Sequence, residues 1–325
     1  MLIDTYAIFR NANRLAWWDI HNYCKTRCSN DGLHEYVKNR NPSFIDATSD
    51  PFPEKELVVT VTENQLYTIA PILVSDIKVA QQHRDLNFLF YPIWLVSAIQ
   101  SYQGQCDAIK KTRTQQLSCL NRQPRLHRFL TYYLLAQQPW FNQVYISFAG
   151  LDCDLGGCGD VASLDQLFVL GADIKNYFDK TQKQFPIFSD TGYTWNNCHD
   201  STTPAYQDCW ANLATETSVH AFCVTEKITK PLRAGSLFFP VASKQCVDQL
   251  AYMGFDMNYT GIDYSFDQEP DWQLRVRKCV NEISRIYYDL EEIWHANADR
   301  ITYNSELFGS TSLLNYCLQD VKEYV

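Results

Sequence analysis

The chain has 325 residues and a formal net charge of −9, from 28 Lys and Arg against 37 Asp and Glu. Hydrophobic residues make up 46% and charged residues 20%, which excludes a wholly disordered chain. The 12 glycines lack a short period, which excludes a collagen-like chain. At roughly 100–200 residues per domain, this length predicts two domains or one large one.

The cysteines and the apolar runs bear on the compartment. The 12 cysteines are spread along the chain, without the dense spacing of small disulfide-rich domains. The first residues, MLIDTYAIFRNANRLAWW, have an acidic fourth position and no long apolar core, unlike a signal peptide. The longest apolar run, Phe88–Ile99, has 12 residues, whereas a bilayer span needs about 20. We therefore expect a cytoplasmic protein with reduced cysteines and no membrane span.

Two apolar runs predict strands in the first third of the chain. Glu56–Asn64 and Phe88–Trp94 are short and rich in β-branched and aromatic residues, as buried strands are. The polar stretch Ser101–Gln116 contains Gly104 and is typical of a linker. We accordingly expect a first domain over residues 1–112 and a second over residues 113–325.

The second domain begins with a predicted strand-helix-strand unit. A strand is expected at 117–121, a helix at 124–138 and a second strand at 143–150. Pro124 suits the first helical position. The helix carries one apolar stripe at helical spacing, made of Leu126, Phe129, Leu130, Tyr133 and Leu134. Such a unit is the repeating piece of a parallel α/β sheet.

An acidic, loop-rich region is expected from Leu151 to about Thr215. The elements predicted after it are a strand at 219–226, a strand at 236–243, a short helix at 244–254 and a stub of strand at 255–257. A long amphipathic helix is expected from Trp272 to about Trp294, because its apolar residues recur at steps of three and four.

Two predicted strand-to-helix corners carry basic residues at the start of a helix. These residues are Arg122, Arg125 and Arg128 at the first corner and Lys227, Lys230 and Arg233 at the second. Helix starts usually favour acids, so cations there, at the carboxyl edge of a parallel sheet, indicate a phosphate site. Pro231 implies that the second helix begins near Thr229 or is kinked. Two alternatives to a phosphate site stay open: ion pairs with the acidic region 150–216, or a solvated helix face within Gln105–Arg128.

A family resemblance rests on residues of these corners. The run Glu216–Met257 contains E-T, then T-E-K-x-x-K-P, a glycine, an apolar strand and L-x-x-x-G-F, and IDYSFD follows it. It resembles the donor-binding half of α1,3-fucosyltransferase-like glycosyltransferases, above all their bacterial and viral relatives. The segment Ser118–Leu135 resembles the start of the same domain. Residues 1–112 show no such resemblance.

The resemblance implies a fold and a reaction. The fold is the GT-B type, two Rossmann-like α/β domains facing a cleft, with a long C-terminal helix that closes across them. The first domain would bind an acceptor, a carbohydrate or another compound with a hydroxyl group. The second would bind a nucleoside-diphosphate sugar, and the sugar would pass to the acceptor hydroxyl with inversion. No cofactor would be obligatory, because Lys, Arg and helix amides can neutralise the departing diphosphate.

The resemblance also implies roles for individual residues. Glu226 would bind the donor ribose and Lys227 the diphosphate, with an arginine of the first corner assisting. The full set expected around the donor is Arg122, Arg125, Glu216, Thr225, Glu226, Lys227 and Lys230. An inverting transfer also needs a general base. Glu63, expected directly after a strand of the first domain, is the candidate; Asp76 and Asp85 are placed less well.

Other sites remain alternatives. Asp152-Cys153-Asp154 is a D-x-D pattern that could hold a divalent metal. Cysteine and histidine patterns could form a zinc site from His21, Cys24, Cys28 and His34, or a thiol nucleophile from Cys198 and His199.

Other functions also remain alternatives. One is a nucleic-acid-directed protein, either a binder or a glycosyltransferase that modifies a DNA base. The net charge of −9 argues against a large duplex footprint for such a protein. Another is a scaffold that keeps the fold without activity.

Overall fold

The computed structural model describes most of the chain, in segments 14–16, 19–20, 23, 32–48, 54–101, 109–121, 123–149, 164–185, 187–188 and 200–321. The chain divides into two compact units. Unit 1 comprises Met1–Gln103, His220–Thr225 and Ser310–Val325, and unit 2 comprises Gly104–Val219 and Glu226–Gly309. In the described residues, no helix is both long enough and apolar enough to cross a membrane.

Unit 1 is built on a parallel sheet whose strands follow chain order. The strands are β1 (Arg14–Ala16), β2 (Phe44–Asp46), β3 (Ile72–Val74) and β4 (Phe88–Phe90). The helices between and after them are α3 (Leu33–Arg40), α4 (Glu54–Glu63), α5 (Ile77–Gln82) and α6 (Ile93–Gln100), with short 3₁₀ turns at Leu66–Thr68 (η1) and Arg84–Leu86 (η2). Because β2 and β3 are buried along their length, both faces of this sheet are covered.

The strand predicted at Glu56–Asn64 is wrong, since this segment is the helix α4. Its valines and threonines favour strands when taken singly. Leu57 and Val61, however, stand four residues apart and are buried, while Val59 is exposed. This one-sided burial is that of an amphipathic helix, and the packing overrides the residue preference. The predicted strand Phe88–Trp94 is correct only in its first part, because α6 begins at Ile93.

The C-terminal segment belongs to unit 1. Helix α15 (Thr311–Cys317) packs against α6, and beyond it Asp320 accepts a hydrogen bond from the Phe90 amide at 3.0 Å. The inserted loop 220–225 is also held within unit 1, where Phe222 O accepts a hydrogen bond from Ser75 Oγ at 3.1 Å. The predicted domain boundary at 112/113 therefore lies nine residues after the division at 103/104. The loop 220–225 and the C-terminal segment Ser310–Val325 were also expected in the second domain, whereas both belong to unit 1.

Unit 2 is built on a five-stranded sheet with the order β7-β6-β5-β8-β9. Its strands are β5 (Gln115–Asn121), β6 (Tyr145–Phe148), β7 (Ile187–Phe188), β8 (Cys209–Thr215) and β9 (Leu237–Val241). All neighbours are parallel except β6 and β7. If β5 to β9 are numbered 1 to 5 along the chain, the spatial order is 3-2-1-4-5, which is the order of a doubly wound sheet. A two-unit α/β protein with predominantly parallel sheets is therefore confirmed.

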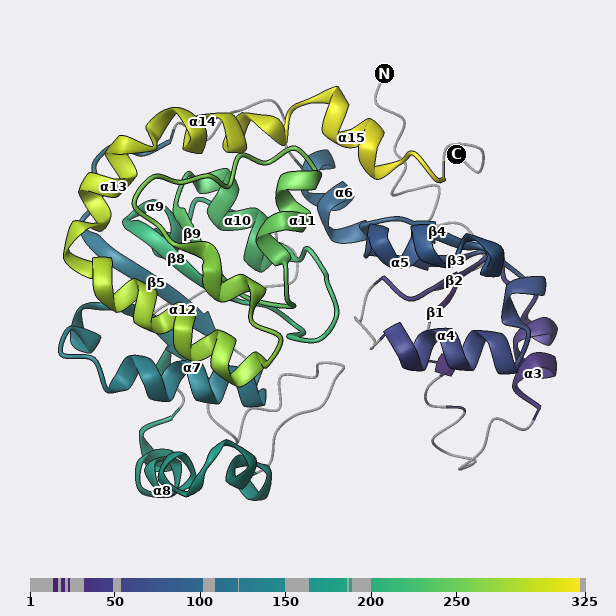
Figure 1. The fold of residues 1–325 in the computed structure, drawn as a ribbon, viewed down its shortest axis with the longest axis horizontal. Helices are drawn as coiled ribbons and strands as arrows, with labels where there is room; N and C mark the ends of the chain where they lie inside the picture. Colours follow the sequence, from purple (N-terminus) through teal and green to yellow (C-terminus); the bar gives the residue numbers. More distant parts are fainter. Residues whose placement is uncertain are drawn as a thin grey trace. The chain divides into compact units, whose positions relative to one another are not determined.

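Helices cover both faces of this sheet. From β5 the chain passes through α7 (Leu126–Ala136) to β6, whereas from β8 it passes through α10 (Glu226–Ala234) to β9 in the other direction. Right-handed crossovers in opposite directions put α7 and α10 on opposite faces. Figure 1 shows α7 beside α12 (Trp272–Ile286), and these two helices pack together.

The remaining elements of unit 2 are short or peripheral. They are α8 (Ala172–Thr181), α9 (Pro204–Gln207), α11 (Cys246–Tyr252), α13 (Leu290–Ala296), α14 (Ala298–Leu307), and the 3₁₀ turns at Phe141–Gln143 (η3), Leu164–Leu170 (η4), Gln182–Gln184 (η5), Tyr264–Gln268 (η7) and Tyr287–Asp289 (η8). The helix predicted from Trp272 to Trp294 is interrupted at η8, so it forms α12 and most of α13. Pro124 precedes the N-cap residue Arg125 and is not the first residue of α7.

One strand of unit 2 was missed and another was misplaced. The sequence predicted a strand at 219–226, but these residues form a loop that runs into α10. The fourth strand is instead β8, with the sequence CWANLAT, inside the region expected to be loop-rich. Every residue of β8 is buried, so it lacks the alternation of polar and apolar residues that marks a half-exposed strand.

Candidate functional site

The sheet of unit 2 has one point at which the strand order reverses, between β5 and β8. From this pair the chain extends to β6 on one side and to β9 on the other. The carboxyl ends of the two strands are joined by a hydrogen bond from Thr215 Oγ1 to Asn121 Oδ1. In open parallel sheets, ligands bind in the crevice outside the carboxyl ends at such a point. We call the charged residues gathered there the switch-point cluster.

The first turn of α7 supplies basic side chains that hold the chain after β8. Arg128 Nη2 donates to the carbonyls of Thr215 at 3.3 Å and Glu216 at 3.2 Å, and Arg125 Nη1 donates to that of Thr217. His127 Nε2 lies 2.8 Å from Glu216 O. Because a carbonyl oxygen only accepts hydrogen bonds, His127 must carry a proton on Nε2. These contacts fix residues 215–217 beside the start of α7.

The first turn of α10 supplies the other charged side chains. Lys227 Nζ donates to Glu226 Oε1 at 2.6 Å. One turn further along, Lys230 is buried and its Nζ lies 5.6 Å from the centroid of the Tyr206 ring. Lys230 and Arg233 also attract the carboxylate of Asp200, whose own hydrogen bonds come from Thr202.

The two groups of charges interact with each other. Burial alone would raise the pKa of Glu226, but the Lys227 ammonium, its hydrogen bond and Lys230 lower it to about 2. Burial and the charge of Arg125 lower the pKa of Arg128 to about 10, although the carboxylates of Glu216 and Glu226 oppose this shift. Glu226 is therefore ionised near neutral pH and accepts hydrogen bonds only.

Positive charge predominates in the described part of the switch-point cluster. Its basic members are Arg125, Arg128, Lys227 and Lys230, and its acidic members are Glu216 and Glu226. Within the described residues, Nε of Arg128 and Oγ1 of Thr229 are buried without a hydrogen-bond partner. Buried charges and polar groups are costly unless they are paired. A bound anion at this cluster would lower that cost.

The residues predicted for the donor site divide into three groups. Arg125, Glu216, Glu226, Lys227 and Lys230 come together in the switch-point cluster, although they derive from segments about 100 residues apart. Thr225 is buried and belongs to the loop segment of unit 1 that precedes α10. Arg122 lies outside the described residues.

The placement predicted for Glu63, the candidate general base, is wrong. Glu63 does not follow a strand; it is the last residue of α4, and it is exposed. Asp76 caps the start of α5, where its Oδ1 accepts hydrogen bonds from the amides of Lys78 at 2.8 Å and Val79 at 3.4 Å. Asp85 lies in the 3₁₀ turn η2. The positions of these acids therefore favour none of them as the base.

The alternative metal and thiol sites fall mostly outside the described residues. This holds for Asp152, Asp154, His21, Cys24, Cys28, Cys198 and His199. His34 is described, and its Nδ1 lies 3.0 Å from Asn64 O. No group of acidic, cysteine or histidine side chains suited to a metal occurs in the part of the chain that the structure describes. The described cysteines are buried.

The described basic residues of Gln105–Arg128 do not form one surface. Lys110 is exposed and forms an ion pair with Asp208, which lies in the acidic region. Arg113 is buried and donates to several backbone carbonyls, among them Tyr206 O at 2.7 Å and Ala234 O at 2.7 Å. Arg128 is buried in the switch-point cluster. The solvated helix face is therefore wrong for these three residues, because Lys110 is exposed but lies outside any helix and Arg113 and Arg128 are buried.

Three described residues beside the switch-point cluster were missed from the sequence: His127, Asp200 and Thr229. His127 stands between the arginines of α7, and its position on that helical turn could have indicated it. Asp200 and Thr229 carry no local pattern. Only the fold brings Asp200 to Lys230 and Arg233 of α10.

Comparison with known proteins leaves the family assignment open. No family model matches the chain, and neither a curated protein nor a solved structure matches it. The resemblance to α1,3-fucosyltransferase-like enzymes therefore stays a prediction carried by the motif residues. Any function is inferred instead from the chemistry of the switch-point cluster.

Proposed function

We propose that this protein is a glycosyltransferase of the GT-B type. It moves a sugar from a nucleoside-diphosphate sugar to an acceptor hydroxyl, without an obligatory metal and with inversion. The acceptor is a carbohydrate or another hydroxyl compound, and the protein acts in the cytoplasm. The observation that carries the proposal is the meeting of Arg125, Arg128, Glu226 and Lys227 at the carboxyl ends of β5 and β8.

The cations of the switch-point cluster suit a diphosphate. Glu226 holds the ammonium group of Lys227 in an ion pair. The Lys227 side chain is about one-fifth exposed, so it still borders solvent. Arg125 is half-buried at the N-cap of α7, where the positive end of the helix dipole adds to its charge. A nucleotide sugar leaves a diphosphate behind as the bond to the sugar breaks. Fixed positive charges beside that leaving group stabilise the transition state more than the ground state.

Glu226 has a complementary role. Its carboxylate is ionised across the neutral range and lies beside the lysine that would contact the diphosphate. The ribose of a nucleotide is joined directly to the phosphates, and its hydroxyls donate hydrogen bonds. We assign Glu226 to the ribose hydroxyls, because a carboxylate is the strongest neutral-pH acceptor available to them.

The nucleic-acid alternative has less support. A protein that tracks a nucleic-acid backbone needs basic side chains spread over an exposed surface. In the described residues, Arg113, Arg128, Lys230 and Arg233 are buried instead. This favours a small anionic ligand in a confined site.

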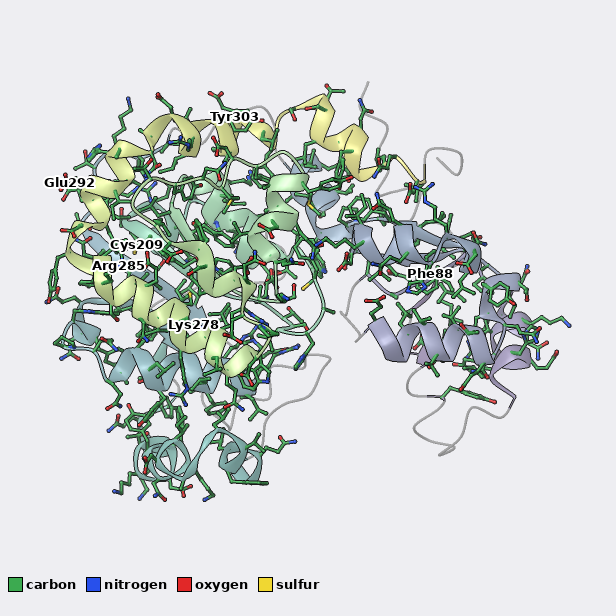
Figure 2. All side chains as sticks on the ribbon, viewed as in Figure 1. Phe88, Cys209, Lys278, Arg285, Glu292 and Tyr303 are labelled. Atoms are coloured by element: carbon green, nitrogen blue, oxygen red, sulfur yellow. The ribbon has the colours of Figure 1, made fainter. Side chains whose placement is uncertain are left out.

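The proposal is tested by donor turnover without an acceptor. Nucleotide sugars carrying guanosine, uridine, cytidine and adenosine diphosphates are incubated with the protein in EDTA, and release of the free nucleoside diphosphate is measured. We expect release for one base, reduced about 100-fold in Lys227→Ala through loss of charge stabilisation. The matched control is Lys278→Ala on α12, which removes an exposed lysine and should leave the rate unchanged (Figure 2). Equal rates in both variants, or no release from any donor, would contradict the proposal.

A further inference from the structure

Unit 2 contains a cavity of about 480 Å³ that is separate from the switch-point cluster. It lies between the start of α11, the loop after that helix and the 3₁₀ turn η7. Tyr264, which lines it, donates a hydrogen bond to Phe238 O of β9 at 2.6 Å. In the described sheet β9 is an edge strand, whereas the cluster lies between β5 and β8. The volume falls in the range of small-molecule sites, roughly 300–1,000 Å³.

The interior of the cavity is largely buried and partly aromatic. Met257, Tyr259 and Asp267 are buried, and Ile262 and Tyr264 are half-buried. The Tyr259 hydroxyl accepts a hydrogen bond from Asn304 Nδ2 at 2.9 Å, so both tyrosine rings are oriented by contacts of their hydroxyl groups. The two tyrosine rings offer flat apolar surface to a ligand, and the side chains of Met257 and Ile262 add further apolar surface.

The rim of the cavity is polar. Asp248, Asn258, Ser265 and Gln268 line it and are exposed. Gln268 Nε2 donates to Asp248 Oδ2 at 2.8 Å, so a carboxylate and a carboxamide lie side by side at the opening. Together these side chains both donate and accept hydrogen bonds.

The lining restricts the class of ligand. None of the described residues that line the cavity is basic, so nothing there balances the charge of a phosphate or a carboxylate. Asp267 uses its two oxygens to accept from the amides of Cys246 at 3.2 Å and Val247 at 2.9 Å, which leaves it poorly placed to bind a cation. Groups that both donate and accept, next to aromatic faces, match sugar hydroxyls and the apolar C–H face of a sugar ring.

We propose that this cavity binds a neutral mono- or disaccharide. The hydroxyls contact Asp248, Asn258 and Gln268, and one face of the ring packs towards Tyr264. This site does not depend on the proposed transferase activity, because no residue of the switch-point cluster lines the cavity.

Saturation-transfer NMR on the full chain tests the proposal with D-glucose, D-galactose, D-mannose, N-acetylglucosamine, lactose and maltose. We expect saturable transfer to at least one of these sugars. Asn258→Ala and Gln268→Ala should each weaken its binding about tenfold, through loss of a hydrogen bond. Both positions are exposed, so circular dichroism should show an unchanged fold. Glu292→Gln, at an exposed position of α13, is the control and should bind like the wild type (Figure 2).

Three outcomes would overturn the proposal. The first is no transfer to any of the sugars. The second is binding that survives both rim variants but is lost in Lys227→Ala, which would assign the sugar to the switch-point cluster. The third is displacement of the sugar by guanosine, uridine, cytidine or adenosine through the same rim residues, which would make the cavity a nucleoside site. Sugar binding that Lys227→Ala leaves intact supports the cavity even if the transferase proposal fails.

Discussion

Arg113, Arg128 and Arg275 are all nearly excluded from water but differ in what their guanidinium groups contact. Arg113 donates from all three of its nitrogens, mostly to backbone carbonyls. Arg275 likewise uses each nitrogen on a carbonyl, of Ala242, Glu269 and Val219. Only Arg128 combines an unpartnered Nε with neighbouring carboxylates. Of these three described arginines, Arg113 and Arg275 therefore stabilise the fold, and Arg128 is the one suited to a ligand oxygen.

Asp267 gives a prediction about pH at the same scale. Burial raises its pKa from 3.8 to about 6, despite hydrogen bonds from the amides of Val247 and Cys246. Between these pH values the folded state holds a proton that the unfolded state has released. The stability from this residue is therefore fully present below about pH 4 and falls as the pH rises to about 6, by about 3 kcal/mol in total.

Urea unfolding of the wild type and of Asp267→Asn, at pH values from about 4 to about 7, measures this effect. The asparagine does not titrate, so the free energy of unfolding of the wild type should fall relative to that of the variant as the pH rises. Asp299→Asn, at an exposed position of α14, should show no such change relative to the wild type. A constant difference between the wild type and Asp267→Asn over the whole range would rule out the buried protonated carboxyl.

For single residues, the T-E-K motif was a better guide to the candidate site than a residue's position after a predicted strand. Glu226 and Lys227 were selected because they follow the T-E-K pattern, and the structure places them in one ion pair. Their role in donor binding stays a prediction. The position of Glu63 could not be predicted, because the strand expected before it is in fact the helix α4. Asp200 could not either, because its approach to Lys230 and Arg233 depends on the tertiary fold.

Prediction of individual elements succeeded for α7 and for three strands of unit 2. The helix predicted at 124–138 corresponds to α7, and its stripe of Leu and aromatic residues could be identified from spacing alone. The strands predicted at 117–121, 143–150 and 236–243 correspond to β5, β6 and β9. Prediction failed at β8 and α4 for opposite reasons. The fully buried β8 has no polar-apolar alternation, and it contains Ala and Asn where the equally buried β9 has large apolar residues. In α4, β-branched residues conceal the helical spacing.

Helix α15 and its flanks should stabilise unit 1 selectively. Leu313, Leu314 and Cys317 are buried, and Asp320 accepts a hydrogen bond from the Phe90 amide of β4. Removal of Ser310–Val325 should therefore increase hydrogen exchange in β3 and β4, by tenfold or more, while β5 and β8 of unit 2 keep their protection. Exchange measured by mass spectrometry on the full-length and shortened chains tests this expectation.

Point variants refine that experiment. Asp320→Ala should increase exchange at Phe90, whereas Gln319→Ala, at the exposed neighbouring position, should not. Equal loss of protection in the sheets of both units would show that the segment does not act on unit 1 alone.

At the scale of the whole molecule, the sequence could predict two α/β units but not how the chain is shared between them. Unit 1 is formed from three separate segments, and unit 2 is interrupted by the loop 220–225. Local patterns carry no information about which distant segments join a unit, or about the order β7-β6-β5-β8-β9. That order is what brings the first turns of α7 and α10, about 100 residues apart, to the edge formed by the carboxyl ends of β5 and β8.

Calorimetric titration of the full chain with GDP, UDP, CDP and ADP in EDTA measures whether a nucleoside diphosphate binds at that edge. We expect one of them to bind, with an affinity reduced at least tenfold in Lys227→Ala and unchanged in Lys278→Ala. Binding only after addition of a divalent metal would show that the site depends on a metal. If none of the four binds the wild type, or if Lys227→Ala binds equally well, the assignment of the switch-point cluster to a nucleotide sugar is wrong.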